Sequence, residues 1–154
     1  MINENLKLSG QLDIVLKDKN GNVKDSRTET NLVVNSGLAF IISRMNGTTK
    51  SVMSHMALGS SSTAEAASQT DLVAILGSRE VLDSTTITGT NNEKIQYVSS
   101  FEAGDATGAV QEAGIFNHGT VATGDMLSRT TFAVVNKAAD DTMTVTWTIT
   151  LSAV

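Results

Sequence analysis

The sequence predicts a mainly β fold: one antiparallel β-sandwich or jelly-roll-like domain with an N-terminal β-hairpin and one short α-helix over about residues 36–46. Apolar and polar residues alternate at both ends of the chain, over residues 5–17 and 143–151, which is the pattern of half-buried strands. Between these ends, strand-like segments are separated by Gly- and Asn-containing turns. Strand and helix patterns do not alternate repeatedly, so about seven antiparallel strands are expected rather than a parallel sheet.

The N-terminal hairpin is predicted from residues 5–17 and the turn that follows them. Apolar residues of one parity line this strand: Leu6, Leu8, Leu12, Ile14 and Leu16, with Gly10 in the remaining slot. Asn20-Gly21 favours a tight turn because both residues accept positive φ. The returning segment, Val23–Thr30, is polar on both faces, which is typical of an edge strand or an extended arm.

Three charged residues of this returning segment are candidate assembly residues: Lys24, Arg27 and Glu29. They can blunt edge pairing between sheets, or they can contact a neighbouring subunit, since an extended edge can add to another sheet. We therefore expect an N-terminal hairpin arm over residues 1–30 and a β-sandwich core domain over residues 31–154. We also expect the core domain to fold without the arm.

The helix is predicted within the stretch NLVVNSGLAFIISRM, residues 31–45. Ser36 is a suitable N-cap, and Asn46-Gly47 supplies a stop signal. One apolar stripe recurs at helical spacing: Leu38, Ile41, Ile42 and Met45. We expect this stripe to pack over an open end or face of the sheets.

The remaining segments predict further strands and loops. A short apolar strand over residues 51–59 leads into a polar loop over 60–70 and a brief helical turn between Thr70 and Gly77, followed by strands over 80–88, 94–103, 110–116, 126–135 and a C-terminal strand from Met143. In the strand over 94–103, one face carries Ile95, Tyr97, Ser99 and Phe101; in the last strand, Met143, Val145, Trp147, Ile149 and Leu151 alternate with Thr. These faces are the predicted core.

Composition excludes several classes of function. With 154 residues the chain suits one domain, and without cysteine it cannot form disulfides or use a thiol nucleophile. The net charge of −5 and the scattered Lys and Arg residues argue against a nucleic-acid partner. The start of the chain lacks a signal-like pattern, and its apolar runs are too short to span a membrane, so we expect an unexported protein with no membrane partner.

Candidate chemical groups are few. The two histidines, His55 and His118, lack partners at metal-ligand spacing. The serines of LGSSST lack the second glycine of a nucleophile elbow. The remaining candidates are turn carboxylates that can bind calcium but match no calcium loop: Asp140, Asp141, Glu102, Asp105 and Glu112. We therefore expect no enzymatic activity, no cofactor and no bound metal.

Four ordered motifs resemble those of tailed-bacteriophage virion structural proteins, including tail-collar-fibre-like domains. The matching positions are Asn31, Asn35, Gly37 and Leu38; Leu58, Gly59, Thr70 and Leu72; Glu112, Gly114, Ile115 and Phe116; and Met126, Leu127 and Arg129. The resemblance covers residues 31–151. A tail-collar fibre would continue into a shaft or tip, whereas this chain ends in a core strand, so we expect a free-standing domain.

The resemblance implies a capsid decoration or cement protein that stabilises the shell by binding across capsomers. It implies the major capsid protein or tail proteins as partners, a homo-oligomer with a trimer as the leading form, and a place in the virion after assembly in the host cytoplasm. A tail accessory or tail-fibre or collar component is the alternative. A glycan-binding, adhesin-like module is a second alternative, which would require aromatic residues on a loop surface.

Overall fold

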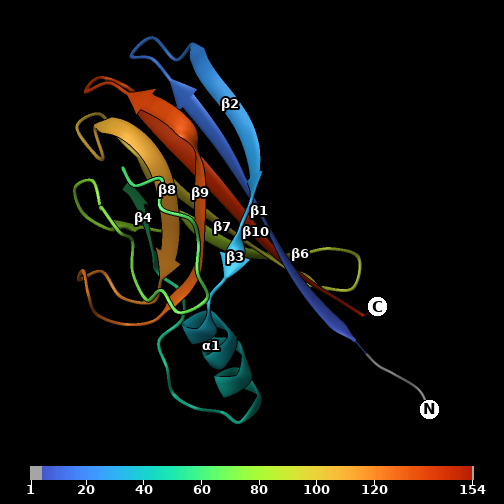
Figure 1. Cartoon of the computed structure of the whole chain (residues 1–154). Coiled ribbons are helices and arrows are strands. Elements are labelled where there is room, and N and C mark those ends of the chain that lie inside the picture. Colours follow the sequence, from blue (N-terminus) through green and yellow to red (C-terminus); the bar gives the residue numbers. More distant parts are fainter. Residues whose placement is uncertain (1–4, 154) are drawn as a thin grey trace.

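The computed structural model describes residues 5–153, so the outermost ends of the predicted arm and core domain, residues 1–4 and Val154, lie outside the described residues. Two antiparallel five-stranded sheets face each other, with one helix at one end (Figure 1). The predicted class, a mainly β sandwich with one short helix, is confirmed.

The first sheet has the strand order β2-β1-β10-β7-β6 and the second has the order β3-β9-β8-β4-β5. The strands of the first sheet are β1 (Leu6–Lys17), β2 (Val23–Thr30), β6 (Ser84–Thr88), β7 (Lys94–Phe101) and β10 (Thr142–Ala153). Those of the second sheet are β3 (Leu32–Val33), β4 (His55–Gly59), β5 (Glu80–Val81), β8 (Gly108–Phe116) and β9 (Met126–Lys137), and the helix is α1 (Asn35–Met45).

The core lies between the sheets and uses the alternating residues that the sequence predicted. β1 pairs with β10 along its whole length, which places Leu12 opposite Trp147 and Ile14 opposite Val145. All four side chains are buried, and Trp147 is 0% exposed. Full burial of each aliphatic side chain stabilises the fold by about 1.5–3 kcal/mol.

The N-terminal hairpin is built into the first sheet. Its turn follows the prediction: Gly21 has a φ of 82°, and the Asp18 carboxylate accepts hydrogen bonds from the backbone N–H groups of Asn20 and Asn22. β1, however, lies between β2 and β10. Removing residues 1–30 would leave one edge of β10 unpaired beside Trp147. Folding of residues 31–154 without the hairpin stays a prediction.

Two local predictions in the middle of the chain are wrong. Residues 80–88 form two strands rather than one, because the chain crosses between the sheets: β5 pairs with β4, whereas β6 pairs with β7. The helical turn expected between Thr70 and Gly77 is instead an irregular loop. This loop is held by an isolated bridge between Gly59 and Ile75 rather than by helical hydrogen bonds.

The helix occupies nearly the predicted span but begins differently. Its N-cap is Val34, which makes no side-chain capping bond. Ser36 is therefore not the cap: its hydroxyl donates to the carbonyl of Met126 on β9, at 2.7 Å. The helix N-terminus is thus fixed to the second sheet, and the backbone N–H of Asn35 donates to the carbonyl of Ala67 in the loop between β4 and β5, at 2.8 Å.

The helix faces the opposite way from the prediction. The buried residues are Gly37, Phe40 and Ser43, while much of the predicted stripe is exposed: Leu38, Ile42 and Met45. Gly37 gives the physical reason, since a β-carbon there would stand 2.0 Å from the backbone oxygen of Leu127. The helix can approach β9 this closely only with its glycine side inward.

We predict that Gly37→Ala destabilises the fold by about 1–3 kcal/mol, although alanine is the better helix former by about 1 kcal/mol. The added methyl group would meet a backbone carbonyl that cannot rotate away. Chemical denaturation followed by Trp147 fluorescence measures the change in the free energy of unfolding. Leu38→Ala, on the exposed side of the same helix, is the control and should change stability little; a Gly37→Ala protein as stable as the parent would contradict this account of the helix orientation.

Candidate functional site

The three predicted assembly residues do not gather into one surface. The ammonium group of Lys24 lies 2.5 Å from the carboxylate of Asp141, and this hydrogen bond is the main reason that the pKa of Asp141 falls below its usual value. Arg27 forms an ion pair with Asp25 and donates to the carbonyl of Ala133 on β9, at 2.6 Å. Glu29 lies half-buried opposite Leu12 on β1.

Most of the candidate metal ligands fall into two groups. His55 lies near His118. Glu102, Asp105 and Asp141 lie near Lys137, whose ammonium group donates to the carbonyl of Glu102 at 2.8 Å. The ring of His55 contacts the hydroxyl of Ser54, and burial lowers the pKa of His55. His118 accepts a hydrogen bond from the backbone N–H of Thr120. Within residues 5–153, no group of three His, Asp or Glu side chains is placed to hold a metal ion.

Of the predicted calcium-binding carboxylates, Glu112 has a quite different role. It is fully buried on β8 and forms an ion pair with the equally buried Arg129 of β9, with Nε and a terminal nitrogen of the guanidinium 3.0 and 2.8 Å from Oε2. The same carboxylate accepts hydrogen bonds from the backbone N–H groups of Val73 and Ala74, at 3.1 and 2.7 Å. Every strong hydrogen-bonding direction of this buried charge is therefore used.

Arg129 completes the attachment of the loop between β4 and β5. Its guanidinium donates to the side-chain oxygen of Gln69 and to the carbonyl of Thr63, both at 3.0 Å. The pairing of Glu112 with Arg129 was not predicted from the sequence. The sequence signal for it is one charged residue in each of two mostly uncharged strands, Glu112 in residues 110–116 and Arg129 in residues 126–135. A charged side chain that is buried in a strand of this kind requires a partner.

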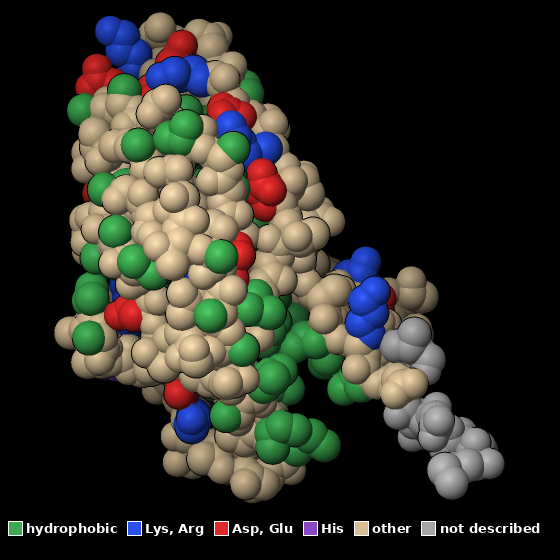
Figure 2. All heavy atoms as spheres, in the orientation of Figure 1, with side chains coloured by type: hydrophobic (Ala, Val, Ile, Leu, Met, Phe, Trp, Pro, Cys, Tyr) green, Lys and Arg blue, Asp and Glu red, His purple; other side chains and the backbone are tan. Residues whose placement is uncertain are grey.

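At the opposite side of the molecule, part of the first sheet projects past the second. This part, here called the wing, consists of the N-terminal end of β1, the C-terminal end of β10 and the β6–β7 hairpin (Figure 1). Its inward face carries Leu6, Leu8, Ile87, Ile95 and Leu151. Figure 2 shows hydrophobic side chains gathered in the recess between the helix and the wing.

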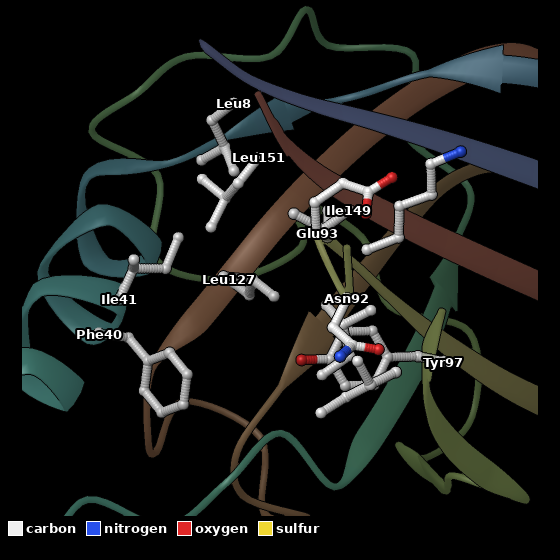
Figure 3. A pocket seen from close by; sticks show the side chains of 12 residues that line it. Leu8, Phe40, Ile41, Asn92, Glu93, Tyr97, Leu127, Ile149 and Leu151 are labelled. Atoms are coloured by element: carbon white, nitrogen blue, oxygen red, sulfur yellow. The ribbon is translucent and has the colours of Figure 1, made fainter. Parts of the chain in front are cut away.

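An apolar groove of about 220 Å³ runs between the wing and α1. Phe40 and Ile41 line its helix side, and Tyr97 and Ile149 line its sheet side (Figure 3). A neighbouring hollow of about 300 Å³ shares Phe40 and Tyr97 with it and reaches Val52. The groove therefore continues along the helix rather than closing as a small-molecule pocket.

The outer side of α1 adds a second apolar surface, here called the stripe: Leu38, Ile42 and Met45. Ile42 is 62% exposed and Met45 is 82% exposed. The helix has one charged residue, Arg44, which donates to the carbonyl of Lys50 and lies over the ring of Phe40. A helix face of this composition is typical of a contact surface rather than a solvated one.

The aromatic residues that a glycan-binding surface would need are inside the protein. Trp147 is fully buried in the core, and Tyr97 is 5% exposed at the bottom of the groove. Burial raises the pKa of Tyr97 to about 12. Neither ring is available as a flat platform for a sugar.

Comparisons with protein-family models, curated proteins and solved structures found no match. In the described part of the chain, α1 is too short and too polar at its ends to be a bilayer-spanning helix. The features from which a function can be argued are therefore the chain's own: a buried ion pair that attaches the loop between β4 and β5 to the second sheet, and two apolar surfaces at one end. Such surfaces bind by removing apolar area from water.

We predict that Glu112→Gln and Arg129→Met each destabilise the protein by about 3–5 kcal/mol, because each leaves the other charge buried without its counter-ion. The double variant should lose less than the sum of the two, since it removes both charges together. Chemical denaturation of the four proteins gives the coupling free energy. Lys50→Met breaks an ion pair with Asp125 in which both side chains are partly exposed, at 36% and 23%, and should cost under about 1 kcal/mol. Strictly additive losses at Glu112 and Arg129 would contradict the structural role of their pairing.

We predict that Tyr97, the single tyrosine, ionises near pH 12 in the folded protein. Its folded pKa lies above the ordinary value of 10.0, so its contribution to stability is complete below pH 10 and is lost as pH rises from 10 towards 12. Ultraviolet difference absorbance against pH measures the ionisation. The chain unfolded in guanidinium is the control and should titrate near pH 10; the same midpoint in the folded protein would show that the tyrosine hydroxyl is solvated.

Proposed function

We propose that this protein is a structural component of a tailed-bacteriophage virion, and specifically a capsid decoration or cement protein that binds across capsomers. The observation that carries the proposal is the pair of exposed apolar surfaces, the wing and the stripe, at one end of the sandwich. Exposed apolar surface of this extent on a single domain is typical of a protein that binds other subunits. The sequence resemblance supplies the kind of assembly.

The residues that carry the resemblance support it by lying together. Gly37 packs against Leu127, Gly59 lies across the sheet from Glu112, and Glu112 pairs with Arg129. The motif residues thus contact one another where α1, β4, β8 and β9 meet, and are not four unrelated turn or strand patterns. These contacts hold the helix that bears the stripe against the second sheet.

In this role the protein performs no bond chemistry and needs no cofactor. It stabilises a shell by burying surface between subunits, and each exposed aliphatic side chain can contribute up to about 1.5–3 kcal/mol when fully covered. Many identical copies then act together through the symmetry of the shell. The proposed partners are the major capsid protein and further copies of this chain, with a trimer as the oligomer that the resemblance favours.

A tail accessory, tail-fibre or collar component would use the same surfaces at a different place in the virion. The fold suits a component of the tail as well as one of the shell, and the copy number per particle separates the two places. The glycan-binding alternative gains nothing from the structure, because Trp147 and Tyr97 are buried.

We predict that quantitative mass spectrometry of purified phage particles finds this chain at a copy number comparable to that of the major capsid protein, on the order of hundreds per particle, as icosahedral symmetry requires for a decoration protein. About six to a few dozen copies would place it on the tail instead. Particles that contain the capsid and tail proteins but none of this chain would overturn the virion proposal. Host proteins carried through the same purification provide the background level.

A further inference from the structure

We propose that the stripe of one copy of this chain packs on the wing of a second copy, so that the two copies cover each other's exposed apolar surfaces. The inference names a partner for the apolar end of the molecule and rests on the proposed assembly role. Its basis is the structure of the two surfaces and of the groove between them.

The inward face of the wing has the apolar alternation of core strands, but part of this face is exposed. On β1 the inward parity continues from buried Leu12 through half-buried Leu8 to Leu6, which is 74% exposed. Leu8 is paired with Leu151 of β10, and Ile87 of β6, 64% exposed, is paired with Ile95 of β7. The apolar face therefore extends across four strands beyond the point where residues 5–153 provide a covering layer.

The stripe is the matching surface. Because Gly37 must face β9, the helix turns Leu38, Ile42 and Met45 away from its own sheets. An apolar helix face normally packs on the apolar face of a sheet, as one layer on another. The chain thus carries both halves of a helix-on-sheet contact, and within residues 5–153 of a single copy neither half is fully covered.

The size of the two surfaces fits a second copy. Five side chains are strongly exposed here: Leu6, Leu38, Ile42, Met45 and Ile87. A fully exposed side chain of this kind offers about 60–120 Å² of apolar area, so at exposures of 46–82% the five together supply roughly 200–390 Å². A small interface buries up to about 600 Å² per partner, of which about 57% is apolar, or roughly 340 Å².

The groove gives this contact a place for an anchoring side chain. Its volume is about 220 Å³, whereas an apolar cavity of about 150 Å³ is enough to hold benzene. One side chain of the stripe, such as Ile42 or Met45, can therefore enter it from a second copy. Interface energy is typically concentrated in anchors of this kind.

The inference is tested by measuring self-association of the purified chain and of variants that introduce a glutamate into the stripe or a lysine into the wing. Sedimentation or light scattering should show the parent protein as a dimer or larger closed oligomer. Ile42→Glu in the stripe and Ile87→Lys in the wing, at sites of nearly equal exposure (62% and 64%), should each weaken association by at least about tenfold. Mixing the two variants should restore a mixed pair, because the new glutamate then meets the new lysine.

One control variant and a second pair of charged variants show whether the effect is specific to the two surfaces. Val134→Glu places the same charge on β9, at an exposed valine away from both surfaces, and should leave association unchanged. Met45→Glu with Leu6→Lys repeats the charge pairing at independent positions, and Trp147 emission reports that each variant is folded. A monomeric parent protein, association that survives both single substitutions, or a mixture that stays monomeric would each overturn the inference.

This result is separable from that of the particle measurement. A chain abundant in particles but monomeric when pure would refute the stripe-on-wing contact and leave the virion proposal standing. A chain that pairs as described but is missing from particles would support the stripe-on-wing contact and refute the virion proposal.

Discussion

The buried ion pair between Glu112 and Arg129 is the constraint on which the arrangement of this protein depends. It bridges β8 and β9 and also binds the loop between β4 and β5 through the backbone groups of Val73, Ala74 and Thr63. That loop in turn accepts the first hydrogen bond of the helix through Ala67. A charge pair hidden in the second sheet therefore helps to determine which surface the helix presents outside.

Much of the fold follows from local patterns that can be read in the sequence. Alternation identified β1, β7 and β10 and their core faces, because one face of each strand is buried where the two sheets overlap. The Asn20-Gly21 turn fixed the hairpin. The division of residues 80–88 was not visible, because a chain that passes from one sheet to the other keeps an extended conformation on both sides of the crossing.

The candidate site was harder to predict than the fold, for two physical reasons. Helical spacing identified the apolar residues Leu38, Ile42 and Met45, but periodicity alone does not distinguish a face covered by the same chain from one left for another molecule. Here the lack of a β-carbon at Gly37 decided the matter. The Glu112–Arg129 pair depends on the register of β8 and β9. That register shifts at two places, and the local sequence pattern predicts neither shift.

The pairing of β1 with β10 also determines how the molecule responds to mechanical load. The two strands are antiparallel, and Leu6 lies opposite Ala153, so both described ends of the chain emerge side by side at the wing. A force that pulls these ends apart opens the ladder of hydrogen bonds one rung at a time. A force between the C-terminal end of β10 and the turn that follows β1 must instead slide the two strands past each other, which loads many of their hydrogen bonds at once and so requires a larger force.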